Sequence, residues 1–493
     1  MTATPTDAAA SGGPTGDRTT APVPVPVGAG DTVLRPLGPT ERWYWLADQV
    51  SPYNGLARVR VRGDLTADDI AAALTELQRR HPLLRAAVRA DAKGRPVFVA
   101  VPGRAAELRT GPLTDLDGQW VEELQERESC RPLDLARGPA FRAVLLSTPD
   151  GLTHDLLLVV SHVVVDASSL VSLLRECVTA VAADGRGREA ERTVLPPVEE
   201  LIPRAHRTYR PAELLRTARS MVREQRRIKE RAPVRIVGGE RVPFAERRSG
   251  LVHRSVPAAA LDALLAESRR QGTTVHGALG AALVRAAAEH ADDLFAPEDR
   301  PGPDGSMRIT LGSPVDLRAR LEPRVAPEEV GAFVSMLRTN VDHRPEREFW
   351  ETARSITTDM RERREQSEDF CMLHISRWVV PRADKGVLKL LEAAEASNPQ
   401  NLALSNFGRV DFPERDGPLR FSEVQLAASL GASCYLGAVV VTAHDTANLN
   451  LNYLRRAISP ETAVAVADRW HRLVMERCEA AGAGGDGAAA ARA

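Results

Sequence analysis

Residues 156–167 read Leu156-Leu-Leu-Val-Val-Ser-His-Val-Val-Val-Asp-Ala167. The first five residues are all apolar, which is typical of a strand buried on both faces of a sheet. His162 therefore lies where a buried strand ends, and the carboxylate of Asp166 follows four residues later. An imidazole at such a place is well situated to act as a general base. A plainer interpretation also fits, in which His162 is a hydrogen-bonded core residue and Asp166 is the N-cap of the next helix.

Strand and helix patterns alternate on both sides of this stretch. Runs of apolar residues and turn signals predict strands at 141–147, 156–160, 308–316, 437–443 and 449–453. Helical spacing of apolar residues predicts helices at 65–78, 167–183, 258–271, 275–290 and 461–478. Such alternation favours α/β layers in each half of the chain.

Composition divides the chain into five parts. Residues 1–34 are rich in Thr, Ala, Pro and Gly without the apolar core of a signal peptide, so we expect a disordered tail. Two folded lobes are expected at 35–185 and 251–480, and a second tail at 481–493. The linker at 186–250 is strongly basic from Arg204 to Arg235. A solvated face is the favoured interpretation of that basic run, and an acidic partner is the alternative.

Charge and cysteine content exclude several classes of protein. The net charge is −1 over 493 residues, so nothing recommends nucleic acid or an anionic membrane as a partner. The five cysteines lack C-x-x-C spacing, which argues against a zinc site and favours a reducing cytoplasm. No metal site is predicted, because the histidines are scattered without ligand spacing. No stretch approaches 18 consecutive apolar residues, so no transmembrane helix is expected.

The stretch from Ser161 to Ala167 resembles the H-H-x-x-x-D-G signature of the chloramphenicol-acetyltransferase-like superfamily. That superfamily includes peptide-synthetase condensation domains and polyketide-associated acyltransferases. Other segments resemble family segments and follow the same order, over roughly residues 37–480. They are Thr40-Glu-Arg-Trp-Tyr-Trp-Leu46, Arg79-Arg-His-Pro-Leu-Leu-Arg85, Leu133-Asp-Leu-Ala-Arg-Gly-Pro-Ala-Phe-Arg142, Thr273 to Ala282, Ser313-Pro-Val-Asp-Leu-Arg318, Gly331-Ala-Phe-Val334 and Ser405-Asn-Phe-Gly408.

Two positions depart from the family signature. Ser161 stands where the family has its first histidine, and Ala167 stands where it has glycine. A serine hydroxyl can still donate and accept hydrogen bonds. An alanine would cost about 1 kcal/mol if the backbone at that position were left-handed.

The resemblance implies two α/β lobes, each a sheet packed with helices, that meet in a V with the active site in a tunnel between them. It implies that His162 is the general base and that Asp166 pairs with Arg318 of the second lobe to hold the motif loop. Ser161, Ser405 and Asn406 are candidates to line the tunnel or to stabilise the oxyanion. No bound cofactor is expected.

The resemblance thus predicts an acyltransferase, acting in secondary or lipid metabolism as a monomer. The donor would be an acyl group on the phosphopantetheine of an acyl carrier protein, or acyl-CoA. The acceptor would be a small-molecule hydroxyl or amine, giving an ester or an amide. The alternatives are a free-standing condensation protein of the peptide-synthetase type and, because of Ser161 and Ala167, a non-catalytic scaffold that binds carrier proteins.

Overall fold

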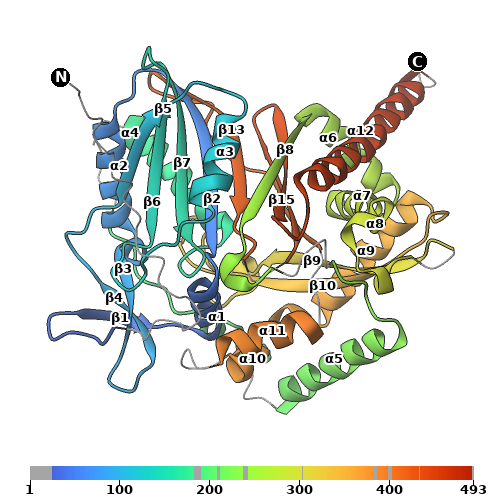
Figure 1. Cartoon of the computed structure of the whole chain (residues 1–493), viewed down its shortest axis with the longest axis horizontal. Helices are drawn as coiled ribbons and strands as arrows, with labels where there is room; N and C mark the ends of the chain where they lie inside the picture. The colour runs from blue at the N-terminus through green and yellow to red at the C-terminus, as the bar shows by residue number, and fades with distance from the viewer. Residues whose placement is uncertain are drawn as a thin grey trace, which may run out of the picture.

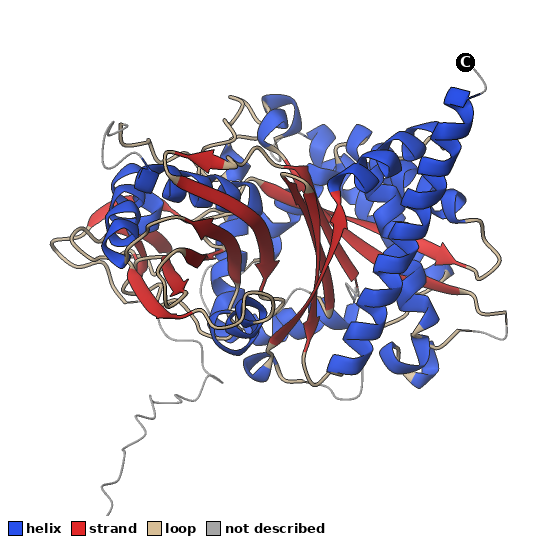
Figure 2. Ribbon diagram, turned by 90° about the horizontal axis from the view of Figure 1, so that it is seen from above, coloured by secondary structure: helices blue, strands red, loops and turns tan. Residues whose placement is uncertain are grey.

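The computed structural model describes residues 25–182, 190–207, 211–236, 242–301, 304–380, 386–397, 402–431 and 434–490. Its strands form two six-stranded sheets and one three-stranded sheet. The two large sheets lie side by side, and most helices cover their outer flanks (Figures 1 and 2). The predicted α/β fold with two lobes, each a sheet packed with helices, is therefore confirmed.

The first large sheet contains the strand that leads to His162. In spatial order its strands are β12 (Arg415–Asp416), β13 (Leu419–Ala428), β2 (Asn54–Arg62), β7 (Thr153–Ser161), β6 (Phe141–Ser147) and β5 (Glu107–Pro112). The small sheet beside it consists of β1 (Thr32–Pro36), β4 (Pro96–Ala100) and β3 (Ala86–Ala90). Because β7 lies between β2 and β6, both of its edges are paired and its end is held firmly.

The second large sheet begins at a free edge and ends near the first lobe. In spatial order its strands are β10 (Val334–His343), β9 (Met307–Asp316), β11 (Leu402–Arg409), β14 (Leu436–Ala443), β15 (Thr446–Leu454) and β8 (Ser249–Pro257). β14 and β15 form an antiparallel hairpin that turns at His444 and Asp445.

The helices lie mainly outside the sheets. Those of the first half are α1 (Pro39–Val50), α2 (Ala67–Arg80), α3 (Gln119–Glu123), α4 (Ala167–Ala182) and α5 (Pro211–Glu230). Those of the second half are α6 (Ala258–Arg270), α7 (Val275–Glu289), α8 (Ala291–Leu294), α9 (Phe349–Glu365), α10 (Glu368–Val379), α11 (Val387–Ser397) and α12 (Pro460–Ala490). The helix expected at 65–78 begins at its Thr66 cap, whose hydroxyl accepts the amide of Asp69.

One strand crosses between the lobes, against the expectation that 251–480 forms a lobe by itself. β13 pairs antiparallel with β2 of the first sheet, from Arg420 opposite Arg62 to Ala428 opposite Gly55. Buried residues of β13, such as Phe421 and Leu426, complete the first hydrophobic core. The edge of β2 thereby gains a partner, and a bare sheet edge is avoided.

Both expected tails are shorter than the composition suggests. At the N-terminal end β1 begins at Thr32, inside the predicted tail 1–34, and Pro26 bridges to Ala90. At the C-terminal end α12 continues to Ala490, through most of the predicted tail 481–493. Alanine is the best helix former, so a helix that is already nucleated extends readily through this Ala-rich stretch. Residues 1–24 and 491–493 lie outside the described residues.

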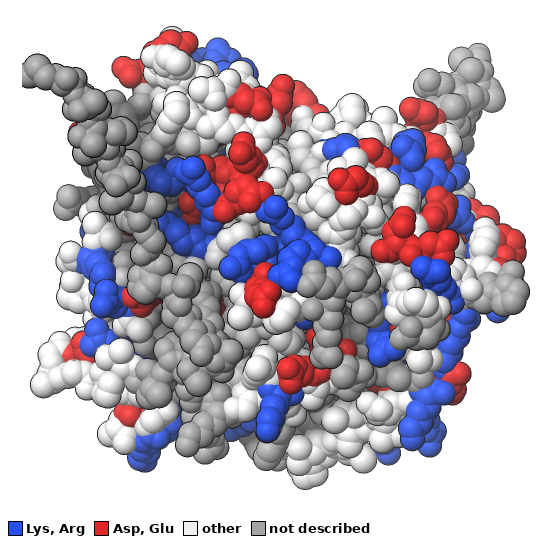
Figure 3. All heavy atoms as spheres, viewed as in Figure 1, with Lys and Arg blue, Asp and Glu red and all other residues white. Residues whose placement is uncertain are grey.

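The basic segment of the linker is largely exposed, in agreement with a solvated face, and it also forms ion pairs with the second lobe. Within it, arginines of α5 form ion pairs with acidic residues of α9 and α10. Arg223 pairs with Glu368 at 3.0 Å and Arg227 with Asp359 at 3.3 Å. Elsewhere on the surface, acidic and basic side chains intermingle over the face shown in Figure 3, in keeping with the balanced net charge.

Candidate active site

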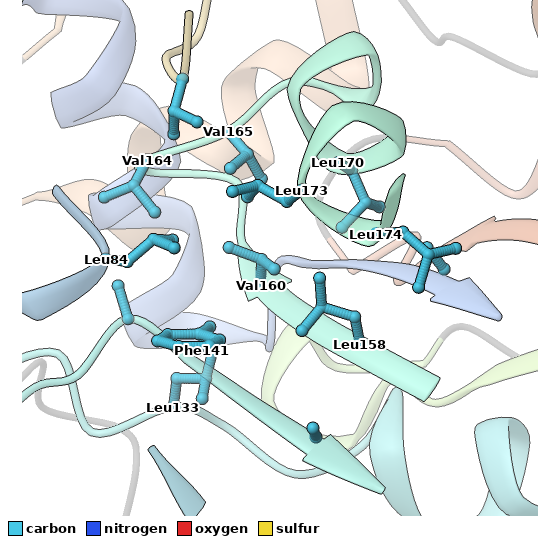
Figure 4. Close-up of a cluster of buried hydrophobic side chains, with 14 of the residues drawn as sticks. Leu84, Leu133, Phe141, Leu158, Val160, Val164, Val165, Leu170, Leu173 and Leu174 are labelled. Atoms are coloured by element: carbon cyan, nitrogen blue, oxygen red, sulfur yellow. The ribbon is translucent and has the colours of Figure 1, made fainter. Parts of the chain in front are cut away.

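The loop that carries His162 is fixed by apolar packing on both sides. β7 ends at Ser161, which pairs with Asn54 of β2, and α4 begins six residues later. Val164 and Val165 are buried in the first core, and Figure 4 shows them among Leu84 and the leucines of α4. Fully burying a side chain of this size contributes about 1.5–3 kcal/mol, so the loop has little freedom to move.

The ring of His162 has one nitrogen engaged and one available. Its Nδ1 lies 3.1 Å from the carbonyl oxygen of Val165. A carbonyl only accepts, so Nδ1 carries the proton and donates it. The neutral ring then presents a lone pair at Nε2, and no hydrogen bond joins Nε2 to any residue in the described part of the chain. This is the tautomer that a general base requires.

Two tyrosines and a glycine surround the imidazole. The ring centroid of Tyr53 lies 5.2 Å from that of His162, and the centroid of Tyr44 lies 5.9 Å away. Tyr44 and Tyr53 stack on each other with their centroids 5.4 Å apart. A Cβ added at Gly55 would lie 3.7 Å from Nε2 of His162. Glycine at this position therefore leaves space beside the available nitrogen.

Burial lowers the pKa of His162 below its ordinary value, while the hydrogen bond to Val165 and the charge of Asp166 act in the opposite direction. The net shift favours the neutral ring, which is the form able to accept a proton. Burial also raises the pKa of the Tyr44 hydroxyl, so that side chain stays protonated beside the histidine.

Asp166 forms a bidentate pair with Arg318 of the second half. Nη1 of Arg318 donates to Oδ2 at 2.7 Å and Nη2 donates to Oδ1 at 2.9 Å. The exposed fractions are 5% for Asp166 and 4% for Arg318. The amide of Phe333 also donates to Oδ2, at 3.0 Å. The structure thus brings the two candidate residues together at the contact between the halves.

Asp166 is at the same time the cap of the helix that follows. Its Oδ1 accepts the amide of Ser169 at 2.9 Å, which is the N-cap arrangement. The hydroxyl of Ser169 accepts a hydrogen bond from Arg318 and donates to the carbonyl of Gly331. With four donors on its two oxygens, the Asp166 carboxylate has no free position from which to take a proton during a reaction.

Ser161 and Ala167, the two departures from the signature, both fit the local structure of the motif loop. Ser161 is fully buried, and its Oγ accepts the amide of Val163 at 3.2 Å inside the turn. This placement favours a role in shaping the loop over a role in lining a tunnel. Ala167 begins α4 and is not among the residues with positive φ, so its methyl group brings no left-handed strain.

Ser405 and Asn406, adjacent on β11, have side chains on opposite faces of the second sheet. Ser405 pairs with Val439, which is buried in the core of the first lobe. Its face of the sheet is therefore turned toward the first lobe. Asn406 pairs with Val440, which is buried in the second core, and its Oδ1 accepts the amide of Gly408. Asn406 thus closes a turn, and only Ser405 lies on the side of the first lobe.

Sequence reasoning did not single out Tyr44, Tyr53, Gly55 and Ser169 as parts of the site. Tyr44 belongs to a segment that resembles the family, but its neighbours Trp43 and Trp45 carry the same aromatic signal. Ser169 follows the motif within one helical turn, and that spacing could have indicated it as a partner of Arg318.

Two hollows of the described surface lie away from this site. One is lined by residues 409–414 with 444–445, and the other by residues 126–132 with Arg109 and Arg248. His162 lines neither of them, so the tunnel stays a prediction. In the described ranges, no three or more His, Cys, Asp and Glu side chains are grouped so as to hold a metal ion. No described helix is both long enough and apolar enough to cross a membrane.

Two family models match the chain, one in each half. Residues 42–214 match the condensation domain, and residues 255–432 match the C-terminus of phthiocerol/phthiodiolone dimycocerosyl transferase. Among curated proteins, the nonribosomal peptide synthetase kk1B of Curvularia clavata is 28% identical over 313 residues. That match covers 60% of this chain but only 2% of the synthetase.

Solved structures show the same fold at low sequence identity. The first condensation domain of the CDA synthetase has a TM-score of 0.64 and is 16% identical, with 90% of this chain and 96% of that chain covered. Polyketide synthase associated protein 5 from Mycobacterium tuberculosis has a TM-score of 0.60 and is 14% identical, with 91% and 98% covered.

The resemblance to the chloramphenicol-acetyltransferase-like superfamily is therefore confirmed by a family model in each half, and the chain has the two-lobed fold of the solved condensation domain. The first half is thus similar to condensation domains, and the second half is similar to the C-terminus of a dimycocerosyl transferase. Both of these families are transferases.

Proposed function

We propose that this protein transfers an acyl group from a thioester to a hydroxyl or amine acceptor, with His162 as the general base. The donor would be an acyl-phosphopantetheine on a carrier protein or an acyl-CoA. The observation that carries the proposal is the state of the imidazole, whose Nδ1 is bound to the carbonyl of Val165 while Nε2 is available. The lobe boundaries at 185 and 251 and the tunnel between the lobes belong to the same proposal.

In the reaction, Nε2 of His162 accepts the proton of the acceptor hydroxyl or amine as the acceptor oxygen or nitrogen attacks the thioester carbonyl. The carbon–sulfur bond then breaks, and the thiolate leaves with the proton that the imidazolium returns. Ser405 is the candidate donor to the oxyanion, since it lies on the face of the second sheet turned toward the first lobe. Asp166 and Arg318 position the loop and take no proton.

The amide-forming alternative draws support from the first half, which matches the condensation domain. An amine acceptor would make the protein a free-standing condensation protein of the peptide-synthetase type. The non-catalytic scaffold has less support, because Ala167 brings no left-handed strain and His162 keeps an available nitrogen.

Replacement of His162 by alanine tests the proposal directly. His162→Ala should lower turnover about 10²–10⁴-fold, because the proton acceptor is lost. Free-thiol release from a panel of acyl thioesters, with pooled alcohols and amines as acceptors, measures turnover, and mass analysis identifies the product. His471→Ala, a partly exposed histidine on α12, is the matched control. Wild-type turnover in a correctly folded His162→Ala variant would refute the assignment.

The pH dependence offers a second test. A base must be neutral, and His162 is neutral above its pKa, which burial lowers from the usual 6.5. Activity should therefore hold as the pH falls through 6.5 and decline only at lower pH. The pH profile of kcat/KM measures the midpoint of this acidic limb for the free enzyme. A midpoint above the ordinary histidine value would contradict the proposed base.

A further inference from the structure

Arg338 on β10 is largely enclosed by other residues, and the described part of the chain holds no hydrogen-bonding or ionic partner for its side chain. Burial lowers the pKa of its guanidinium, and its Nε is buried without a hydrogen bond. No ion pair or hydrogen bond joins Arg338 to any residue in the described part of the chain. The side chain nevertheless keeps some accessible surface. An arginine removed from bulk water ordinarily has a carboxylate or carbonyl partner, so this exception needs an explanation.

The neighbouring acids are already taken. Glu224 of α5 is the acid whose charge acts on Arg338, but its carboxylate accepts Arg363 at 3.2 Å and Asn340 at 3.2 Å. Arg363 acts on Arg338 in the opposite direction, as a like charge.

The ion pairs around Arg338 already occupy the acidic residues described there. Three arginines here share three acids, since Arg223, Arg227 and Arg363 pair among Glu224, Asp359 and Glu368. Arg338 is a fourth cation and has no fourth acid.

The sheet register places Arg338 on the same face as Ser405. Arg338 pairs with Gly312 of β9, and Gly312 pairs with Ala403 of β11, two residues before Ser405. Directly paired residues share a face, and alternate residues of a strand do so as well. At β14 this face is turned toward the first lobe, where Val439 is buried. At β10 the same face carries α5, whose Glu224 accepts a hydrogen bond from Asn340. Arg338 and Ser405 therefore lie on one face of the sheet, with β9 between their strands.

The distance along β10 between Phe333 and Arg338 determines which part of a ligand could reach Arg338. The amide of Phe333 binds Asp166 at the motif loop, and Arg338 lies five residues further on. At about 3.3 Å per residue, its Cα is about 16 Å from that anchor. A group bound there would belong to the far end of an extended substrate and not to the reacting atoms.

We propose that Arg338 binds an anionic group, a carboxylate or a phosphate, at the end of the substrate remote from His162. This inference rests on the proposed acyl transfer, which supplies an extended substrate. The planar fork of a guanidinium suits both anions, and a ligand anion would supply the missing partner. The carboxylate would come from a dicarboxylic acyl chain, and the phosphate from the pantetheine arm.

Binding measurements by calorimetry distinguish the two sources without any need for turnover. One arm compares adipoyl- with hexanoyl-N-acetylcysteamine, which differ in a terminal carboxylate. The other compares hexanoyl-phosphopantetheine with hexanoyl-pantetheine, which differ in a phosphate. In one of the two pairs, the wild type should bind the ligand with the extra anionic group about tenfold to one hundredfold more tightly than its neutral counterpart. Arg338→Met should abolish that preference. Equal binding in both arms, or a preference that survives in Arg338→Met, would overturn the proposal.

A stability measurement guards against a purely structural role. Removing a surrounded charge that has no partner should leave the melting temperature of ligand-free Arg338→Met unchanged or raise it. A fall of several degrees would mean that Arg338 supports the fold, and the proposal would fail. Arg226→Met on the exposed side of α5 removes the same charge and is the control. His162→Ala should lose turnover yet keep the anion preference, so failure of the catalytic proposal is recognised separately.

Discussion

Two buried carboxylates in the first half of the chain, Asp166 and Asp155, each hold arginines and each connect to the second half. Asp166 accepts both terminal nitrogens of Arg318. Asp155 accepts Arg58 at 2.7 Å and Arg60 at 3.0 Å, both from β2. The second half completes this cluster through Glu423 of β13, which binds Arg58 at 2.9 Å and Arg60 at 2.7 Å.

The two clusters lie at opposite ends of the same strand and have different tasks. Asp155 precedes His162 by seven residues, about 23 Å along an extended strand. Asp166 follows His162 by four residues and binds the loop itself. Both clusters join the halves, but only the Asp166 pair lies in the loop that carries the imidazole. Substitutions in the Asp155 cluster should therefore lower stability alone, whereas substitutions in the Asp166 pair should lower both stability and activity.

The largest loss of stability is expected for Asp155→Asn. Arg58 and Arg60 are 0% and 2% exposed, and the substitution leaves both without their main partner. Stranding a buried charge costs about 3–5 kcal/mol, and two arginines place this variant at the upper end. Thermal denaturation measures the loss, and kcat per folded molecule should be unchanged. A lowered kcat with normal stability would break the distinction between the clusters.

A smaller loss of stability, together with a loss of activity, is expected for Asp166→Asn. Arg318 keeps its contacts to Asp316 and to the carbonyl of Glu329, so the cost should be about 3 kcal/mol. Because the loop shifts, kcat should fall about 10- to 100-fold.

The matched control for Asp166→Asn is Asp316→Asn. Asp316 is an exposed acid that touches the same arginine at 3.3 Å, and its loss should cost less than about 1 kcal/mol. Loss of activity in Asp166→Asn without loss of stability would contradict the positioning role and indicate that Asp166 takes part directly in proton transfer.

Among the carboxylates of the two clusters, the smallest effect is expected for Glu423→Gln. The side chain of Glu423 is 41% exposed, and Asp155 stays in place for both arginines. The loss should be about 1–2 kcal/mol, with kcat unchanged. Thermal denaturation beside Glu414→Gln, an exposed glutamate nearby, measures it. A loss as large as that of Asp155→Asn would show that the crossing strand carries the cluster and that Asp155 is not its main anchor.

Local pattern was enough to predict the elements around His162. β6, β7, α2 and α4 were all predicted within a few residues, because apolar spacing and the Thr66 cap act over short range. Asp166 and Arg318 could be named as partners because each lies in a segment that resembles the superfamily. The faces of Ser405 and Asn406 needed the register of β11 with β14, although adjacent strand residues always point to opposite sides.

No local sequence pattern indicated the cluster around Asp155. Arg58 lies 97 residues from Asp155 and 365 residues from Glu423, and no periodicity relates positions so far apart. The crossing of β13 was missed for the same reason, since the alternating pattern of a strand does not say which sheet it joins. Glu423 also adopts a left-handed backbone at an irregularity of the pairing, which its residue type does not favour.

The late position of β13 has a consequence for how the chain emerges during synthesis. β2 is complete at residue 62, whereas the strand that covers its outer edge ends at residue 428. While the ribosome adds the intervening residues, the first sheet carries an open edge able to pair with another nascent chain. Yield in cells should therefore depend on translation speed and on chaperones that shield strand edges.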